Sequence, residues 1–169
     1  TQEEIGNVAG RAHWWNEPSG GSDGSIDIRE DYLHEYTTSI HENIHQRSRH
    51  DLNTFDLIHV MQNHQTVEEG SVQLMTEEVC KRLGYTPRKT YTKLVDSLRD
   101  LHTILEPRMD DYSYAKMLID RNPIARYNYI MDGIQEYTDK HPHMRKAVKD
   151  RLETAKILFQ KGATTDDKR

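Results

Sequence analysis

The sequence predicts an α+β domain that is mostly α-helical, with a small N-terminal β element followed by a helical bundle. Apolar residues recur at spacings of three and four along most of the chain after residue 30, which is typical of amphipathic helices. Residues 25–30 instead alternate polar and apolar side chains, as a short half-exposed strand does. The 169 residues fit a single domain, 1–169, that can bury a core without disulfides.

The elements follow from local signals taken in order. Residues 1–25 are polar and rich in Gly and Ser, so we expect an irregular N-terminal segment. Residues 163–169 are expected to form a frayed tail. The periodicity predicts helices at about 31–48, 51–63, 66–83, 86–105, 110–120, 123–139 and 142–161.

Capping signals mark several of these boundaries. Thr66 and Glu69 have the spacing of a capping box, and Gly84 provides a stop for that helix. Pro87 and Pro123 each fit the first turn of a helix. The stripes expected to face the core include Leu33, Tyr36, Ile40 and Ile44 in the first helix and Leu94, Leu98, Leu101 and Leu105 in the fourth. In the second helix, the residues that recur at helical spacing are Leu52, Phe55, Ile58 and His59.

Composition excludes several functional classes. The net charge of −5 is mild and mixed in sign, so nucleic acid is not expected as a partner. Cys80 is the only cysteine, which rules out an intrachain disulfide or a Cys-rich zinc module. We expect no membrane span and see no signal peptide, so the expected location is the cytoplasm, native or that of a target cell. The first residue is Thr1 rather than Met, which leaves release from a longer precursor and a truncated chain both open.

His41, Glu42 and His45 form a His-Glu-x-x-His pattern within the first predicted helix. Histidines four residues apart lie one above the other on a helix face, offset by about 40°, where one metal ion can bind both. Glu42 points to the side of this pair and can reach a metal-bound water. These are the ligands and the base of zinc peptidases. Because zinc needs neutral imidazoles, occupancy is expected to fall near pH 6.

A catalytic zinc site usually has three protein ligands, and Glu69 is the candidate for the third. The 24 residues from His45 to Glu69 are enough for the chain to leave the first helix and return beside it. Glu69 could instead serve only as the capping partner of Thr66, and Glu68 would then be the alternative ligand.

His41 to His45, followed about two dozen residues later by Glu68-Glu69-Gly70, resembles the gluzincin zinc metallopeptidases. The resemblance covers residues 37–71 and implies a zincin-like fold, one Zn²⁺ per chain bound by His41, His45 and Glu69, and Glu42 as the general base. The chain looks most like the small single-domain members or the peptidase domains of secreted toxins or effectors. This implies a peptide or protein substrate and a delivery partner or precursor. Gln73 departs from the thermolysin-like pattern, in which an Asp stands four residues after the ligand.

The resemblance also implies a Tyr or His from a later helix that stabilises the oxyanion of the transition state. The sequence does not choose among the five candidates: Tyr112, Tyr114, Tyr127, Tyr129 and His102.

Two other functions stay open at this point. Glu42 and His45 also form the Glu-x-x-His pair of di-metal carboxylate bundles, and Asp56 and His59 give a loose echo of it, which would make the chain a non-proteolytic metal protein. Alternatively, the His-Glu-x-x-His motif is accidental or no longer functional, and the chain is an inactive interaction domain.

Overall fold

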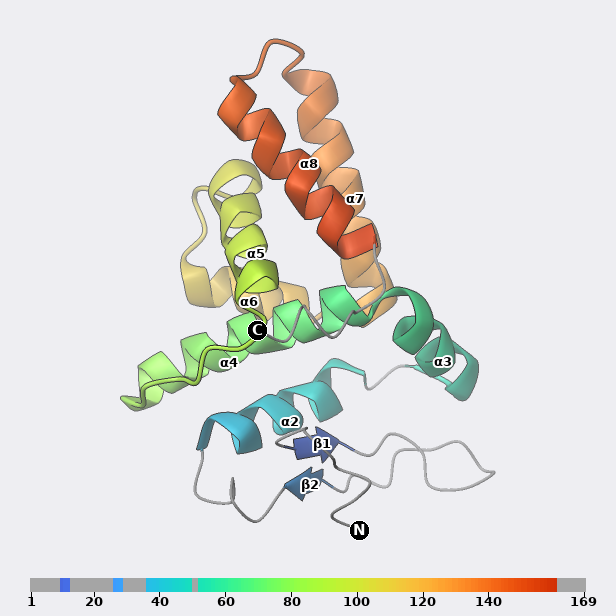
Figure 1. Ribbon diagram of the computed structural model, residues 1–169, viewed down its shortest axis with the longest axis vertical. Helices are drawn as coiled ribbons and strands as arrows, with labels where there is room; N and C mark the ends of the chain where they lie inside the picture. Colours follow the sequence, from blue (N-terminus) through green and yellow to red (C-terminus); the bar gives the residue numbers. More distant parts are fainter. Residues whose placement is uncertain (1–9, 13–25, 29–35, 50–51, 161–169) are drawn as a thin grey trace.

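The computed structural model describes residues 10–12, 26–28, 36–49 and 52–160. Its elements are β1 (Gly10–Ala12), β2 (Ile26–Ile28), α2 (Tyr36–Ser48), α3 (Thr54–Asn63), α4 (Gln65–Leu83), α5 (Thr92–Leu105), α6 (Asp111–Ile119), α7 (Pro123–Lys140) and α8 (Lys146–Gln160). Helix α4 runs through the middle of the molecule (Figure 1). Helix α2 packs on one side of it, and α5, α6 and the antiparallel pair α7–α8 lie on the other.

The predicted fold class, α+β with a zincin-like β element, is wrong. The described residues build a helical fold, and their only sheet is a ribbon of two three-residue antiparallel strands, with Gly10 opposite Ile28. Strand β2 does fall inside the strand predicted at 25–30. However, two strands of this length make no layer of their own, because a stable sheet needs about three strands with a buried face. The helices therefore determine the architecture.

The core lies among the helices and centres on α4 and α5. The predicted stripe of α5 is confirmed, since Leu94, Leu98 and Leu101 are fully buried. Gly70 on α4 allows α5 to approach closely, because a Cβ at this position would lie 2.9 Å from Leu94 Cβ. The buried cluster also includes Val67, Val72, Leu74, Tyr114, Leu118, Ile130, Leu152, Ala155 and Phe159.

Helix α4 begins earlier than the sequence predicts. Its N-cap is His64, directly after α3, and that side chain makes no capping hydrogen bond. Thr66 and Glu69 therefore lie inside the helix, so the predicted capping box is wrong and the Glu69 side chain is available for another role. Gly84 is confirmed as the C-terminal stop, in the left-handed conformation at φ 77°.

Helix α3 is formed as predicted, but the residues whose spacing predicted it do not mark its buried face. Phe55 is 84% exposed and Ile58 is 43% exposed, whereas Leu57 and Val60 are buried. Apolar residues stand at five of the seven positions from 55 to 61, so helical periodicity alone fits more than one face. At the start of the first predicted stripe, Tyr36 is likewise 62% exposed.

The largest boundary error concerns α5, which begins at Thr92 and not at Thr86. Residues 85–90 have no helical hydrogen bonding, and Tyr91, the N-cap, adopts the left-handed conformation at φ 51°. Helices α6 and α7 are capped by Asp110 and Asn122, whose side chains accept from the backbone N–H groups three residues later, and Pro123 is in the first turn of α7 as predicted. Helix α8 begins at Lys146, four residues after Pro142.

Several expectations lie outside the described residues. They concern most of the irregular 1–25 segment, Leu33 and the first turn of the predicted 31–48 helix, and the 163–169 tail. Within the described part of the chain, no helix combines the length and apolar character needed to cross a bilayer.

Candidate metal centre

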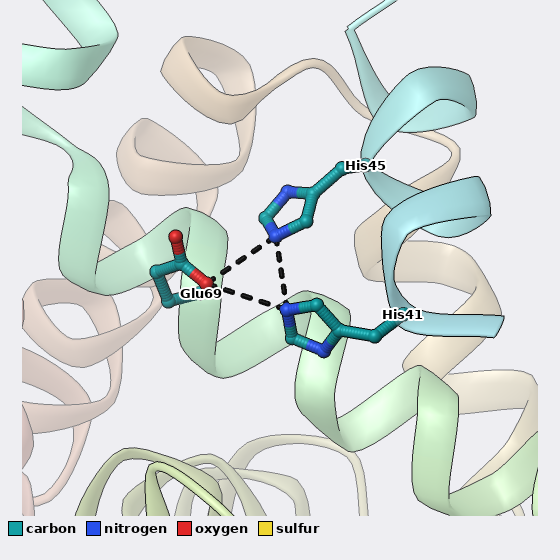
Figure 2. A group of neighbouring side chains, drawn as sticks. All are labelled: His41, His45 and Glu69. Atoms are coloured by element: carbon teal, nitrogen blue, oxygen red, sulfur yellow. Dashed lines mark hydrogen bonds and ion pairs between the residues drawn. The ribbon is translucent and has the colours of Figure 1, made fainter. Parts of the chain in front are cut away.

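Helices α2 and α4 bring the three predicted metal ligands together. His41 and His45 lie one turn apart on α2, and Glu69 faces them from α4 (Figure 2). The two histidine Nε2 atoms are 3.0 Å apart. Glu69 Oε2 lies 3.4 Å from Nε2 of His41 and 3.3 Å from Nε2 of His45. Their side chains thus form a group that could hold a metal ion.

These separations match those of a tetrahedral site. Two N or O ligands at about 2.0–2.1 Å from a zinc ion, at a tetrahedral angle, lie about 3.3–3.4 Å apart. The two distances to Glu69 agree with this value, and the distance between the histidines is slightly shorter. Three ligands on one side leave a fourth position, and the side chains of His41 and Glu69 keep 12% and 14% of their surface exposed.

The outer nitrogen of His45 is held by Glu68. His45 Nδ1 lies 2.7 Å from Glu68 Oε1, and both side chains are buried. A carboxylate can only accept, so Nδ1 carries the proton and donates it. Neutral His45 therefore presents the lone pair of Nε2 to the shared centre. This arrangement of a carboxylate behind a histidine ligand is common in metal sites and fixes both ring orientation and tautomer.

Gln73 plays the same part for His41. Its Oε1 lies 3.2 Å from His41 Nδ1. The Gln73 Nε2 group donates to the Arg88 carbonyl at 2.8 Å and to Glu77 at 3.3 Å, which determines which end of the amide is the oxygen. His41 Nδ1 must then be the donor, and the lone pair of its Nε2 also points at the centre.

Three acceptor atoms thus converge on one point. Two imidazole lone pairs and a carboxylate oxygen at these distances repel one another unless a positive charge lies between them. Either a proton on one imidazole or a metal ion can provide that charge. The arrangement of donors and acceptors around the three side chains therefore favours cation binding.

Glu68 is not part of the converging group. Besides His45, its carboxylate accepts from Ser48 Oγ at 2.8 Å, from Arg49 Nε at 2.7 Å and from Arg126 Nη1 at 2.8 Å. Arg126 is fully buried and also donates to the backbone carbonyls of Leu118, in the last turn of α6, and of Arg121, between α6 and α7. Burial alone would raise the pKa of Glu68, but Arg49, His45 and Arg126 together hold it far below its usual range. Glu68, the alternative ligand that the sequence leaves open, contacts Nδ1 of His45 and not the point on which the three side chains converge.

The two carboxylates determine the charge of His45 in the metal-free chain. Burial alone would lower its pKa, as does Arg49, but the charge of Glu69 and the hydrogen bonds to Glu68 and Glu69 outweigh both. The pKa of His45 is raised from 6.5 to about 9. At neutral pH a proton therefore occupies the centre, and a metal ion must displace it.

Metal affinity is expected to keep rising with pH up to about pH 9, beyond the pH at which an ordinary histidine has lost its proton. Below a pKa of about 9, each lower pH unit should weaken apparent affinity by roughly tenfold, because one proton leaves His45 for each ion bound. Competition with a chromogenic chelator from pH 6.5 to 9.5, corrected for the protonation of the chelator, measures this slope. An affinity that is constant from pH 7 to pH 9 would contradict the protonated centre.

Glu42 and Tyr91 are next to the metal group. Glu42 is 7% exposed, on the turn of α2 between the two histidines. The Tyr91 phenol is hydrogen-bonded to Glu69, and its pKa is raised far above 10 by burial and by the charges of Glu69 and Glu42. The Tyr91 ring also lies nearly parallel to that of His41, with centroids 6.2 Å apart. A candidate ligand and a phenol are thus in contact, and the charge of Glu42 acts on the same phenol.

Sequence reasoning missed Tyr91. Among the described non-glycine residues only Tyr91 has a positive φ, a conformation that costs of the order of 1–3 kcal/mol. Such strain is concentrated at functional sites. Nothing in the pattern around Thr86 and Pro87 distinguishes it, because those residues predict a helix that would carry Tyr91 in its second turn.

The five later candidates make their contacts elsewhere. Tyr112 lies under the Arg82 guanidinium, and Tyr114 stacks on His102, which hydrogen-bonds the Met109 carbonyl. Tyr129 donates to Glu106, and Tyr127 packs against the ring of His64. Among the contacts of the described residues, Tyr91 thus touches Glu69 and His41, whereas these five side chains have other partners.

The echo of a di-metal bundle also lies apart from the centre. His59 Nε2 is 3.1 Å from His64 Nε2, and its Nδ1 is 3.1 Å from the Asn63 amide. Within the described ranges, His41, His45 and Glu69 make the one group of three ligand side chains. A second carboxylate-histidine site, as the di-metal alternative requires, is not formed by those residues.

Comparison with known proteins adds no assignment: no protein-family model matches the chain, and neither the curated proteins nor the solved structures contain a match.

Proposed function

We propose that this chain is a zinc-dependent peptidase of gluzincin type in its ligand set, with His41, His45 and Glu69 as ligands. The observation that carries the proposal is the convergence of two imidazole lone pairs and one carboxylate oxygen, 3.0–3.4 Å apart, beside a buried glutamate. Two histidines and a glutamate with an open fourth position are the ligand set of zinc peptidases. The N and O donors and near-tetrahedral spacing favour zinc over Mg²⁺ or Ca²⁺, which prefer six or more oxygens.

Glu42 is the proposed general base. When bound, zinc would lower the pKa of its water to about 7 and polarise the scissile carbonyl. Glu42 would accept the water proton and deliver it to the departing amine, a role in which its carboxylate must be ionised at the start. Its low exposure keeps bulk water from competing for that proton. The substrate class is peptides or proteins.

Tyr91 is the proposed donor to the reacting carbonyl oxygen. Its phenol donates to Glu69, so it lies beside the three proposed ligands. The raised pKa of Tyr91 keeps the O–H protonated at any working pH, as a hydrogen-bond donor requires. Donors placed beforehand around a developing oxyanion contribute strongly to catalysis.

Metal removal tests the proposal directly. The purified chain is expected to contain about one zinc, to lose cleavage of a quenched-fluorescent peptide library on dialysis against a chelator, and to regain it with one equivalent of zinc. Glu69→Gln removes the anionic ligand, so zinc content and cleavage should fall together. Gln65→Glu, on the first turn of the same helix, is the matched control for an amide–carboxylate exchange at a half-buried site.

Two results would count against the proposal. A chain that neither binds zinc nor melts at a higher temperature in its presence would have no metal centre. A Glu69→Gln chain with the wild-type zinc content and cleavage rate would remove Glu69 from the ligand set.

A further inference from the structure

Gln73 is a buried amide in which every hydrogen-bonding position is used. It is 1% exposed. Its two amide hydrogens go to the Arg88 carbonyl and to Glu77, and its oxygen accepts from His41 Nδ1 and from Thr90 Oγ1, the latter at 2.9 Å. An amide has two donors and two acceptor lone pairs, so no capacity is left over. A buried polar group satisfied in this way holds its neighbours in one arrangement.

Its partners explain why an amide, and not a carboxylate, suits this position. The Nε2 end faces two acceptors, the Arg88 carbonyl and a Glu77 oxygen that lies 3.3 Å away. Glu77 is itself buried and accepts from Arg99 on α5 at 2.8 Å. A carboxylate at position 73 would place its second oxygen against both acceptors. The departure of Gln73 from the thermolysin-like pattern is thus matched by its surroundings.

The same amide binds the segment that carries Tyr91. Residues 85–90 are non-helical, and this segment is held by the Arg88 carbonyl and the Thr90 hydroxyl on Gln73. A second tether joins it to α2, where the Arg88 N–H donates to Thr37 Oγ1 at 3.1 Å. Tyr91 follows directly in its left-handed conformation. One side chain therefore contacts both the His41 ligand and the segment that positions the phenol.

We infer that Gln73 is a positioning residue that sets the orientation of the His41 ligand and the placement of Tyr91 at the same time. The part of this inference that concerns Tyr91 rests on the proposed function. The part that concerns His41 holds for any role that a bound metal has. Gln73 touches no reacting atom and acts through its two neighbours.

The first experiment measures metal alone. Gln73→Met keeps the length of the side chain but removes all four hydrogen bonds, so zinc affinity is expected to fall about 10- to 100-fold, the usual effect of losing a partner behind a ligand. The visible absorption bands of the Co²⁺-loaded variant should also shift, because the His41 ring is no longer fixed. Gln135→Met, on the exposed face of α7, is the matched control and should behave as wild type in both measurements.

A second pair of variants separates the two halves of the role. Gln73→Glu retains the oxygen that accepts from His41 but lacks the donors to Arg88 and Glu77, so zinc affinity should stay within about threefold of wild type. Its cleavage rate at saturating zinc should instead fall toward that of Tyr91→Phe, for which about a hundredfold loss is expected. Helical circular dichroism of each variant verifies the fold.

The outcomes are distinguishable. A folded Gln73→Met chain with wild-type zinc affinity and an unchanged Co²⁺ spectrum would overturn the positioning of His41. A Gln73→Glu chain that cleaves at the wild-type rate while Tyr91→Phe does not would overturn the positioning of Tyr91. Failure of the wild-type chain itself to cleave peptides would count against the proposed peptidase function, and the zinc and cobalt measurements would still decide the first half.

Discussion

Replacing Glu42 with glutamine is expected to leave zinc bound and to lower peptide cleavage by about a hundred- to ten-thousand-fold. The side chain keeps nearly the same volume, and all three proposed ligands remain on α2 and α4. The amide, however, cannot accept the proton of the attacking water, and general-base catalysis is worth roughly that factor. Zinc content by elemental analysis and cleavage of the quenched peptide library, measured on the same sample, give the two values.

The control for this variant is Glu153→Gln, the same chemical change on the exposed face of α8. It should leave both zinc content and cleavage unchanged. If Glu42→Gln cleaved peptides at the wild-type rate, the peptidase proposal would fail. If it lost its zinc, Glu42 would have to be reassigned as a ligand or as a support of the ligands.

Replacing Glu68 with leucine is expected to lower the free energy of unfolding by about 3–5 kcal/mol, as does breaking other buried ion pairs from one side. The change removes the carboxylate that faces His45, Arg49 and Arg126 and leaves two buried guanidinium groups without it. The cost arises mainly from the fully buried guanidinium of Arg126, which loses its ion pair with Glu68. Urea unfolding of the metal-free chain measures this loss without any contribution from zinc.

A double-mutant cycle with Arg126→Met verifies the origin of this loss. Because the second change removes the buried charge that loses its ion pair, the double variant should be more stable than the sum of the two single losses predicts, by about 0.5–3 kcal/mol. Glu136→Leu is the surface control, since the pair that Glu136 forms with Lys140 is exposed, and it should change stability little. Additive single losses would mean that Glu68 and Arg126 do not support each other.

The group that could hold a metal ion could be predicted from the sequence, because its geometry is largely local. Helical periodicity alone places His41 and His45 on one face, and the chain length between His45 and Glu69 allows a return on a neighbouring helix. The choice of Glu69 over Glu68 followed from the resemblance to known peptidases. The fold supplies a physical reason for it, because Glu68 lies beneath α2 among Ser48, Arg49 and Arg126 while Glu69 faces the histidines.

The residues around the ligands could not be predicted, because their partners are distant in sequence. Arg126 is 58 residues from Glu68, and Arg88 is 51 residues from Thr37. No periodicity encodes such pairings. The error at α5 has the same origin, since Thr86 and Pro87 carry a genuine local signal for a helix start that tertiary hydrogen bonds from Gln73 override. The fold class could not be predicted from the alternation at residues 25–30, because six residues are too few to show whether a strand belongs to a sheet with a buried face.

The all-round burial of α4 has a consequence for how a bound ion would leave. Most side chains of this helix from Thr66 to Cys80 are buried, so we expect it to open late, together with the core of the domain. One of the three candidate ligands, Glu69, is therefore on a helix that is held in the core. His41 and His45 are on α2, so a movement of α2 away from α4 would separate the candidate ligands without global unfolding. Metal residence time is then expected to depend on that helix contact, and hydrogen exchange of the α2 amides would report its lifetime.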